Sequence, residues 1–527
     1  MMNAFDVISD HVFQLILRHD RAGSSRIDRF RATIATIVLT ACCSCASAQK
    51  PAEQERAQRS TDEHVQPNIL LILADDLGWR DLTCYGNPWF DTPHLDRLAE
   101  QGMRFTDAYA AAPICSASRA GLLTGKTPAR LGFEFVTKNE PGFQPVEAPL
   151  RAPPFTLDLP LKEETVAEVL REAGYKTAFF GKWHLNRHYK RYLGWSPTHG
   201  PVAQGFETAE EDFGSHPYSY WNNRSDRTFI DLATDEFPED TMIRRAGEFL
   251  HQPHDRPFFL MVSQFFVHTP VHTRARWLYD RNLARIPANH PRREALAHYG
   301  AMVVTLDHLV GRLLQALEDA GQTRSTMVVF TSDNGGHPEY YGNAPLRGSK
   351  WNLYEGGIRV PLIIRWPGRI RANSVSNRPV CGIDLLPTLA NIAGAEPPTN
   401  LDGHSFAFVF DEPTPPRDEH ALLWHFPYYH PEGGFADAPA EIGINDGYTS
   451  QTRPHSALRL GPWKLLHFYE DNRDELYHLP TDPAEQHDRG IGDPEVAGRL
   501  RRLLDARLRE CNARLPTARP PLGQSGQ

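Results

Sequence analysis

The chain has 527 residues, and its 65 Asp and Glu against 56 Lys and Arg give a formal net charge of −9. Hydrophobic residues make up 40% and charged residues 23%, which is typical of a globular protein and excludes disorder of the whole chain. The mildly acidic balance argues against nucleic acid as a partner, because proteins that bind it carry a basic surface. An anionic substrate would therefore need a local cluster of cations.

The N-terminal residues have the arrangement of a signal peptide. Three arginines at 26–31 precede an apolar run at 32–39, which is too short to span a bilayer and is followed by small residues. Two processing routes are open, namely cleavage after Ala48 and lipidation at a lipoprotein box at 39–42. We expect export to the periplasm or cell surface, with membrane contact only through such a lipid anchor. An apolar N-terminal helix without a role in export is the alternative.

From residue 68 onward, short apolar runs alternate with segments of helical periodicity. Buried strands are predicted at 68–73, 177–180, 258–262 and 327–330. Helices are predicted from Pro93, with Thr92 as N-cap, to a stop at Gly102, then at 164–173, and through 299–317. This alternation predicts an α/β fold with a mostly parallel sheet.

The character of the sequence changes after Gly394. Short strands are expected near 457–460 and 463–468, and a closing helix at about 495–509. We therefore predict a smaller C-terminal α+β domain. The expected division of the chain is a signal segment at 1–48, a polar tether at 49–66, a catalytic domain at 67–394, the C-terminal domain at 395–515 and a flexible tail at 516–527.

Oxygen-bearing side chains follow two of the predicted strands. Asp75 and Asp76 come after the first, and Asp333 and Asn334 after the strand at 327–330. Ligands of open parallel sheets bind beyond the carboxyl ends of strands, and adjacent carboxylates repel each other unless a cation or protons neutralise them. The pattern favours Ca²⁺ or Mg²⁺ over zinc, because it lacks the His and Cys ligands that zinc prefers. An exposed acidic turn and an ordinary Asp-Asn-Gly turn are the alternatives.

Between these segments, Cys115 lies where a loop enters a short predicted helix, and Arg119 follows one turn later on the same face. A helix N-terminus and a guanidinium together favour an anion. A buried cysteine with a surface arginine is the alternative on spacing alone.

The run from Cys115 to Arg119, with Leu123-Thr124-Gly125, resembles the signature of type I sulfatases, whose cysteine is oxidised to formylglycine. The resemblance is to exported bacterial members of the arylsulfatase and N-acetylgalactosamine-sulfatase type, and it covers about 67–515. It includes Asp75-Asp76, Gly181-Lys182-Trp183-His184, Val267-His268-Thr269-Pro270, Asp333-Asn334-Gly335 and Gly348-Ser349-Lys350. Ala117 replaces the family's commoner proline, which favours a radical-SAM maturase as partner over the copper-dependent one.

The resemblance implies an alkaline-phosphatase-like fold, with a mixed, mostly parallel central sheet flanked by helices and the smaller C-terminal α+β domain. It also implies hydrolysis of sulfuric esters. The calcium ligands, with magnesium less favoured, would be Asp75, Asp76, Cys115, Asp333 and Asn334. The catalytic residues would be Cys115, Arg119, Lys182, His184, His268 and Lys350.

The resemblance also assigns roles. Hydrated formylglycine at 115 would attack sulfur through one hydroxyl, and its second hydroxyl would allow sulfate to be expelled. Arg119, Lys182, Lys350 and the metal would offset the charge on the sulfate oxygens. His184 would help discharge the intermediate, and it would share a face with Lys182 if the segment is extended. His268, with Lys350, would protonate the leaving oxygen.

Histidine and aromatic residues gather at 215–221 and 424–430. Such rings suit sugar binding, although core packing is the alternative. With the expected export, this favours a sulfated polysaccharide or glycosaminoglycan fragment over an aryl sulfate. Hydrolysis of phosphate or phosphonate esters and non-catalytic binding of sulfated glycans are the alternative functions.

Overall fold

The computed structural model describes residues 66–519, except 139–143, 145–146, 221–227, 231, 339–342, 412–419 and 430–451. The predicted signal segment, all of the tether but Gln66, and residues 520–527 of the tail lie outside these residues, as do Trp221 and His430. Within the described residues, no helix combines the length and the apolar character needed to cross a membrane.

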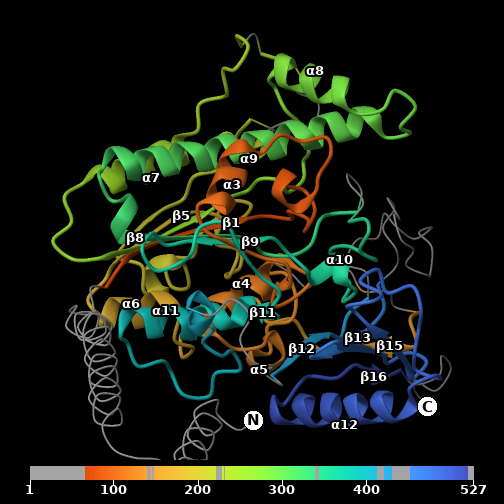
Figure 1. Ribbon diagram of the computed structural model, residues 1–527. Coiled ribbons are helices and arrows are strands. Elements are labelled where there is room, and N and C mark those ends of the chain that lie inside the picture. The colour runs from red at the N-terminus through yellow and green to blue at the C-terminus, as the bar shows by residue number, and fades with distance from the viewer. Residues whose placement is uncertain are drawn as a thin grey trace, which may run out of the picture. The chain divides into compact units, whose positions relative to one another are not determined.

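An eight-stranded mixed sheet lies at the centre of the described chain (Figure 1). Its strands, in spatial order, are β10 (Ser374–Ser376), β2 (Met103–Phe105), β9 (Leu362–Arg365), β8 (Thr326–Ser332), β1 (Asn68–Ala74), β7 (Phe258–Ser263), β5 (Lys176–Gly181) and β6 (Thr208–Glu210). The pairs β8–β1, β1–β7, β7–β5 and β5–β6 are parallel, whereas β9 runs antiparallel to both β8 and β2. The predicted mixed, mostly parallel sheet is confirmed.

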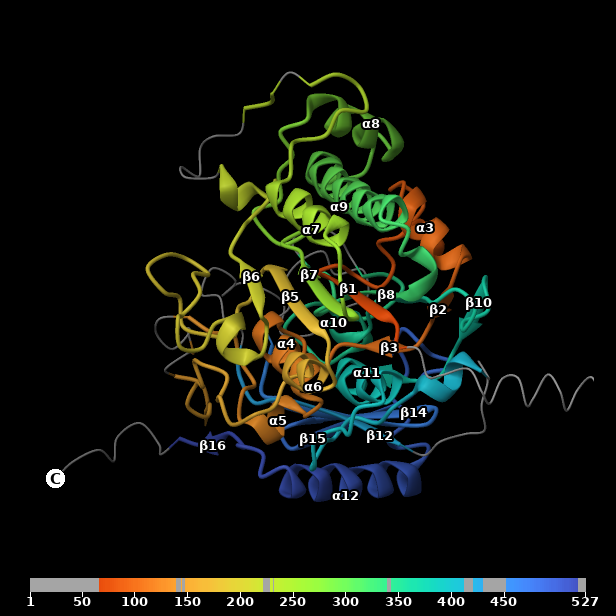
Figure 2. The ribbon, with the colours of Figure 1, turned by 90° about the vertical axis from the view of Figure 1, so that its left-hand side faces the viewer.

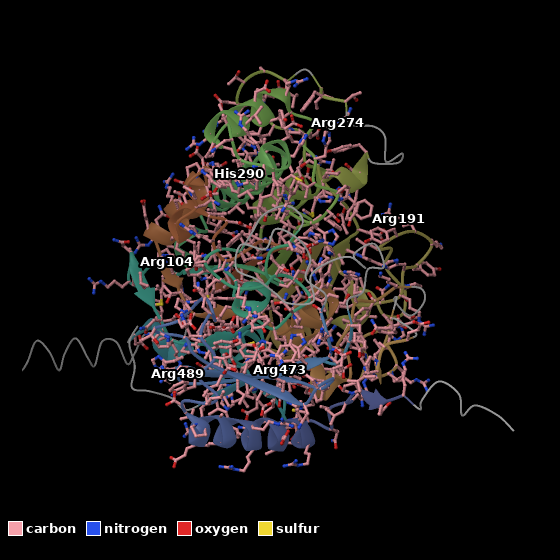
Figure 3. The ribbon with its side chains drawn as sticks, turned by 90° about the vertical axis from the view of Figure 1, so that its right-hand side faces the viewer. Arg104, Arg191, Arg274, His290, Arg473 and Arg489 are labelled. Carbon is pink, nitrogen blue, oxygen red and sulfur yellow. The ribbon has the colours of Figure 1, made fainter. Side chains whose placement is uncertain are left out.

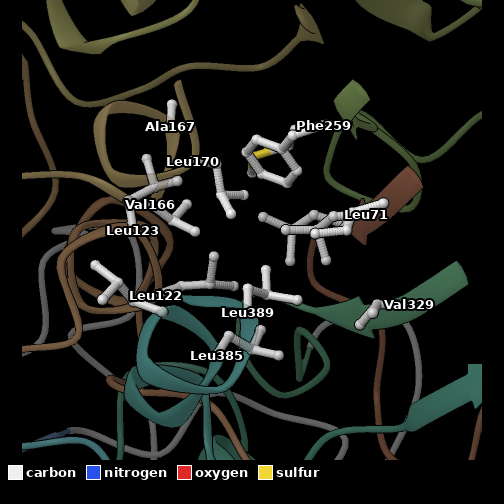
Figure 4. Close-up of a cluster of buried hydrophobic side chains, with 14 of the residues drawn as sticks. Leu71, Leu122, Leu123, Val166, Ala167, Leu170, Phe259, Val329, Leu385 and Leu389 are labelled. Atoms are coloured by element: carbon white, nitrogen blue, oxygen red, sulfur yellow. The ribbon is translucent and has the colours of Figure 1, made fainter. Parts of the chain in front are cut away.

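Both faces of this sheet are covered by helices. Alternate residues of β1 point to opposite sides, so that Leu71 packs in one hydrophobic cluster and Ile72 in the other. Figure 4 shows Leu71 on the side of Leu122, Leu170 and Leu389. These three come from α4 (Cys115–Thr124), α6 (Val166–Glu172) and α11 (Leu385–Ala393). The other face is covered by α3 (Pro93–Glu100), α7 (Thr241–His251) and α9 (Arg293–Asp319) (Figure 2).

The start of α3 differs from the expectation. Thr92 occupies the N-cap position, but its side chain accepts no bond from the helix backbone. Asp307 of α9 does so instead, because its carboxylate accepts the backbone N–H groups of His94 at 3.2 Å and Leu95 at 2.8 Å. A tertiary contact thus satisfies donors that the local sequence leaves open.

A four-stranded antiparallel sheet lies toward the C-terminus. It consists of β12 (Ala421–Phe426), β13 (His455–Leu460), β14 (Trp463–Phe468) and β15 (Arg473–His478). One face packs on α12 (Pro494–Glu510) through Leu500, Leu504 and Leu508. This smaller α+β region agrees with the predicted fold class, whereas the boundary at 394 stays a prediction.

The remaining elements are short, apart from α8 (Arg276–Arg285). They are α5 (Pro128–Leu131), α10 (Glu355–Ile358), β3 (Ala108–Tyr109), β4 (Leu150–Arg151), β11 (Val380–Cys381), β16 (Thr517–Ala518) and the 3₁₀ turns η1 (Thr83–Tyr85), η2 (Pro201–Gln204), η3 (Pro217–Ser219), η4 (Thr323–Ser325), η5 (Gly382–Asp384) and η6 (Ala407–Phe410).

Cationic side chains divide into an outer and an inner set. Figure 3 shows Arg104 and Arg191 at opposite edges of the molecule, and the Arg191 side chain is 55% exposed. By contrast, Arg119, Lys182 and Lys350 are 1%, 1% and 5% exposed. A buried cation requires a counter-charge, so the inner set marks the place where acidic groups gather.

Candidate active site

Four strands deliver polar side chains to one edge of the central sheet. Asp75 and Asp76 follow β1, Lys182 follows β5, Asp333 and Asn334 follow β8, and the loop after β7 carries His268. These strands are parallel neighbours, so their carboxyl ends lie side by side. Helix α4 adds Cys115 and Arg119, and the loop before α10 adds Lys350.

Each carboxylate at this edge is paired with a cation. The Lys182 ammonium contacts Asp75, Lys350 Nζ lies 2.7 Å from Asp76 Oδ2, and Arg119 Nη2 lies 2.8 Å from Asp333 Oδ2. Arg119 is fixed further, because its Nη1 donates to the backbone oxygen of Lys182 at 2.8 Å and to the Ser263 hydroxyl. The pairing offsets the cost of burying so many charges.

Cys115 occupies the centre of the cluster. It is the first residue of α4, is 2% exposed, and places its Sγ 3.4 Å from Asp75 Oδ1 and 3.7 Å from Asp76 Oδ1. Burial, followed by repulsion from Asp333, raises the pKa of the thiol well above its usual value, although Lys182 and Lys350 act in the opposite direction. The unmodified thiol therefore keeps its proton near neutral pH and is a poor nucleophile.

The cluster combines carboxylate and amide oxygens, which suit a hard cation, with a thiol and an imidazole, which zinc prefers and which the strand-end motifs alone did not include. Candidate ligand atoms of Asp75, Asp76, Cys115 and His268 all lie within 4.8 Å of one another. Asn334 Nδ2 donates to Asp76 Oδ1 at 2.7 Å, while its Oδ1 is buried and has no hydrogen-bond partner within the described chain. Carboxylate and amide oxygens are the ligands that Ca²⁺ prefers, and an orphaned amide oxygen fits such a role.

Asp333 lies in the same cluster but is already engaged. Its Oδ1 accepts the backbone N–H of Asp76 at 3.1 Å, and its Oδ2 pairs with Arg119. Burial, followed by repulsion from Asp75, raises the pKa of Asp333 to about 6. Burial alone would raise the pKa of Asp76, but Lys350 and then His268 act in the opposite direction, and the pKa of that carboxyl is lowered. The neighbouring cations therefore offset the charges of these two carboxylates unequally.

The two candidate histidines sit in different surroundings. His268 Nε2 lies 3.7 Å from Asp76 Oδ2, and its Nδ1 lies 2.9 Å from the Tyr218 hydroxyl and 2.7 Å from the Thr269 carbonyl. Burial, followed by Lys182 and Lys350, lowers the pKa of His268 to about 3.

His184 Nε2 lies 3.2 Å from the carbonyl oxygen of Thr137, and its buried Nδ1 has no hydrogen-bond partner among the described residues. The condition of an extended segment is not met here, because Gly181 and His184 have φ values of +105° and +56°. The turn, rather than strand alternation, sets its direction.

Sequence reasoning missed the residues that hold these groups in place. Ser263, the last residue of β7, donates to the Lys182 carbonyl at 2.7 Å and accepts from Arg119. Thr137 donates to the His184 carbonyl at 3.2 Å. Neither residue stands in a motif. Tyr218 belongs to the aromatic segment at 215–221, but nothing in the spacing links it to His268.

The second aromatic segment packs in the core, which is one of the two roles that the sequence left open. Trp424, Phe426 and Tyr428 are 1%, 0% and 0% exposed and pack in the cluster between the C-terminal sheet and the catalytic part of the chain. For these residues core packing is the correct interpretation, and they offer no face to a sugar.

Comparison with known proteins agrees with this geometry. The family model described as Sulfatase matches residues 67–395, and a model of the N-sulphoglucosamine sulphohydrolase C-terminal region matches 349–514. A sulfatase from Formosa agariphila is 32% identical over 498 residues, which cover 81% of this chain and 85% of that protein. The N-acetylgalactosamine-6-sulfatase of Canis lupus familiaris is 35% identical over 367 residues, 64% of each chain. The crystal structure of Ps i-CgsB in complex with k-i-k-neocarrahexaose covers 84% of this chain and 93% of its own, with a TM-score of 0.64 and 26% identity. The chain therefore belongs to the sulfatase family and is a sulfuric ester hydrolase.

Proposed function

We propose that this enzyme removes sulfate from a carbohydrate, using a formylglycine made from Cys115 and a bound calcium ion. The observation that carries the proposal is the convergence of Cys115, three carboxylates and three cations at one buried edge of the sheet. A sulfate ester needs positive charge around its oxygens as the ester bond breaks.

The residues divide into ion-binding and substrate-binding groups. Asp75, Asp76, Asp333, Asn334 and the modified residue 115 would hold the ion, which supplies a fixed positive charge beside the sulfate. The protonated thiol at 115 is unsuited to attack, and conversion of its CH₂–SH group to an aldehyde hydrate would provide a hydroxyl in the same place.

Arg119, Lys182 and Lys350 would bind and orient the sulfate oxygens. Each is held by a carboxylate partner before substrate arrives, so that little reorganisation accompanies the reaction.

Two histidines would move protons. His268 Nε2 faces the acidic cluster, while Tyr218 and the Thr269 carbonyl, which accepts the Nδ1 proton, fix the ring. Because the pKa of His268 is lowered to about 3, Nε2 would first take up a proton, which the negative charge of a bound sulfate ester favours, and would then donate it to the leaving oxygen of the sugar. His184 presents a buried Nδ1 that makes no other hydrogen bond within the described chain, and it would exchange a proton as sulfate is released.

A carbohydrate substrate is supported by two observations. One relative is named for a sulfated amino sugar, and a solved relative was crystallised with an oligosaccharide. Tyr192 is 52% exposed and its ring packs at 5.4 Å on that of Tyr218, which contacts His268. An aromatic side chain beside the leaving group suits a sugar ring.

The test is a panel of sulfated disaccharides and matched phosphate esters, with released sulfate or phosphate measured by ion chromatography. We expect the wild-type enzyme to turn over at least one sulfated sugar faster than an aryl sulfate. Cys115→Ala is the control and should release no sulfate. Preference for the aryl sulfate throughout the panel, or faster phosphate release, would contradict the proposed substrate.

Maturation and export complete the proposal. Ala117 in the signature supports a radical-SAM maturase, and the N-terminal arrangement of arginines, apolar run and small residues supports export, with or without a lipid on Cys42. Peptide mass spectrometry of protein from its native host tests both. Replacement of the Cys115 thiol by an aldehyde is expected, together with an N-terminus at Gln49 or at a lipidated Cys42. An intact thiol would contradict the formylglycine proposal, and an unprocessed N-terminus would contradict export.

A further inference from the structure

A second site for an anion lies between α3, α9, η4 and the end of β9. These elements enclose a cavity of about 360 Å³. Figures 1 and 2 both show α3 alongside α9 on the same face of the sheet. The polar residues that line the cavity include Arg97, Gln101, Thr323, Arg324 and Arg365.

This cavity is remote from the active site. Strand β9 runs antiparallel to β8, and Arg365 is paired with Val328, near the amino end of β8. The active-site residue Asp333 follows the carboxyl end of the same strand. Five residues of extended chain separate Val328 from Asp333, or roughly 16 Å. The two sites therefore lie at opposite edges of the sheet.

Arg365 is the unusual feature of the cavity. Its side chain is 5% exposed, and its Nη1 donates to Gln101 Oε1 at 3.1 Å. Its Nε and Nη2 are buried and have no hydrogen-bond partner in the described part of the chain, where no carboxylate lies within 4.0 Å of the guanidinium. Burial, followed by repulsion from Arg97, lowers the pKa of Arg365. The carboxylate of Glu318 acts in the opposite direction but lies beyond ion-pair distance. A buried guanidinium without a close counter-charge is costly, and a bound anion would supply that charge.

The surroundings add further donors. Arg97 and Arg324 are exposed at the cavity, and neither forms an ion pair with another described residue. Thr323 Oγ1 is buried and makes no hydrogen bond within the described chain. Glu318, an exposed residue of α9, is the carboxylate among the lining residues. Three guanidiniums around one cavity outweigh it, and their planar forks match the oxygens of a tetrahedral oxyanion.

We propose that this cavity binds a sulfate group, held by Arg365 from within and by Arg97 and Arg324 from the solvent side. Two sources offer that chemistry to a sulfatase. One is inorganic sulfate, which the active site releases, and the other is a sulfate ester on a sugar chain. The site binds and has no catalytic role, because its lining residues include no nucleophile beside a base.

Crystals soaked in sodium selenate provide the first test. Selenate replaces sulfate and is located by anomalous scattering at the selenium edge. We expect a peak in the cavity of the wild-type enzyme and none in Arg365→Met, whereas any peak at the active site should be present in both. Absence of the cavity peak from wild-type crystals would overturn binding of the inorganic ion.

Thermal shift in solution provides the second test, at constant ionic strength with chloride as the balancing ion. Sodium sulfate should raise the melting temperature of the wild type more than that of Arg365→Met, with an apparent affinity at least tenfold weaker in the variant. Arg324→Met, on an exposed side chain, should weaken binding without impairing folding. Arg489→Met, remote from the cavity, serves as the matched control. All three variants should keep wild-type activity in sulfate-free buffer.

A third experiment decides whether the bound sulfate group is inorganic sulfate or part of a sugar. The thermal-shift measurement is repeated with a sulfated disaccharide in the Cys115→Ala background, with and without Arg365→Met. A difference between these two variants that appears with the disaccharide and not with sodium sulfate assigns the site to sugar-borne sulfate. Equal shifts in the presence and absence of Arg365, for both probes, would overturn the proposal.

Discussion

Replacing Lys464 by methionine tests how the C-terminal sheet is joined to the active site. Lys464 lies on β14, is fully buried, and places its Nζ 2.9 Å from Glu355 Oε1 and 2.9 Å from Glu485 Oε1. Glu355 begins α10, five residues after Lys350. The variant Lys464→Met keeps the volume of the side chain and leaves two buried carboxylates without their shared cation.

The magnitude follows from the environment of each carboxylate. Removing one partner of a buried ion pair costs about 3–5 kcal/mol. Glu355 keeps Arg359, whose Nη1 lies 3.3 Å from its Oε2, so the cost falls mainly on Glu485. Burial, and then repulsion from Glu355, already raises the pKa of Glu485 to about 7 despite Lys464. Without Lys464 this carboxyl takes up a proton, and we expect a loss of about 3 kcal/mol at pH 7.5 and a smaller loss at pH 5.5.

The assay is urea unfolding followed by tryptophan fluorescence at both pH values. Lys162→Met is the control, because the Lys162 side chain is 81% exposed and its Nζ lies 3.8 Å from Glu163. That variant should change the free energy of unfolding by less than about 0.5 kcal/mol. A loss below about 1 kcal/mol in Lys464→Met, or a loss that grows toward acid pH, would refute the assignment of Glu485 as the uncompensated group.

Three further predictions concern the active site and its support. Cys115→Ala should abolish sulfate release while binding a sulfated sugar with near wild-type affinity in calorimetry, and undiminished turnover would exclude residue 115 as the nucleophile. Chelation by EGTA should lower both activity and melting temperature, and added Ca²⁺ should restore both; failure of Ca²⁺ to restore either would contradict the calcium assignment. His455 accepts the Leu353 N–H through Nε2 at 2.9 Å, and burial lowers its pKa from 6.5 to about 3. The neutral ring is therefore favoured in the folded protein, whereas the unfolded chain takes up a proton below about pH 6.5. The contribution of the neutral ring to stability is full above pH 6.5 and is lost as the pH falls toward 3. In His455→Gln, the free energy of unfolding should fall by about 2 kcal/mol less than in the wild type between pH 7 and pH 5. An unchanged dependence of the free energy of unfolding on pH would contradict this.

The regular elements with strong periodicity were predictable from the sequence. The apolar run of β1 predicted a strand, because a strand buried on both faces is apolar throughout. The apolar stripe of α9 predicted a helix, because its apolar residues recur at the helical period. Strand β9 was missed because it has four residues, and its antiparallel place beside β8 depends on its partner rather than on its own pattern. Helix α11 was missed because it is apolar on nearly all sides and contains Pro387.

For the candidate site, the sequence predicted the charged groups but not the contacts that hold them in place. Motifs identified the charged groups, and parallel strands explain why residues as far apart as Asp75 and Asp333 converge. The supporting contacts did not follow from the sequence. Ser263 beside Arg119, and Tyr218 beside His268, depend on loop conformations that no spacing encodes.

The position of Lys350 depends on residues far beyond it in the chain. Thr452 Oγ1 donates to the Trp351 carbonyl at 2.7 Å, His455 accepts the Leu353 N–H, and Tyr354 donates to Glu475 at 2.6 Å. Together with the Lys464 to Glu355 contact, these bonds hold the segment 351–355 against β13, β14 and β15.

This arrangement makes the C-terminal sheet a support for the active site. Because Lys350 must reach Asp76 Oδ2 at 2.7 Å, a shift of its segment by about 1 Å is expected to lower catalysis by about 100-fold without removing any group that touches substrate. Lys464→Met should therefore lower kcat/KM even at temperatures and pH values where it remains folded, whereas Lys162→Met should not. Full activity in folded Lys464→Met would show that the Lys464 contact is not needed to position Lys350.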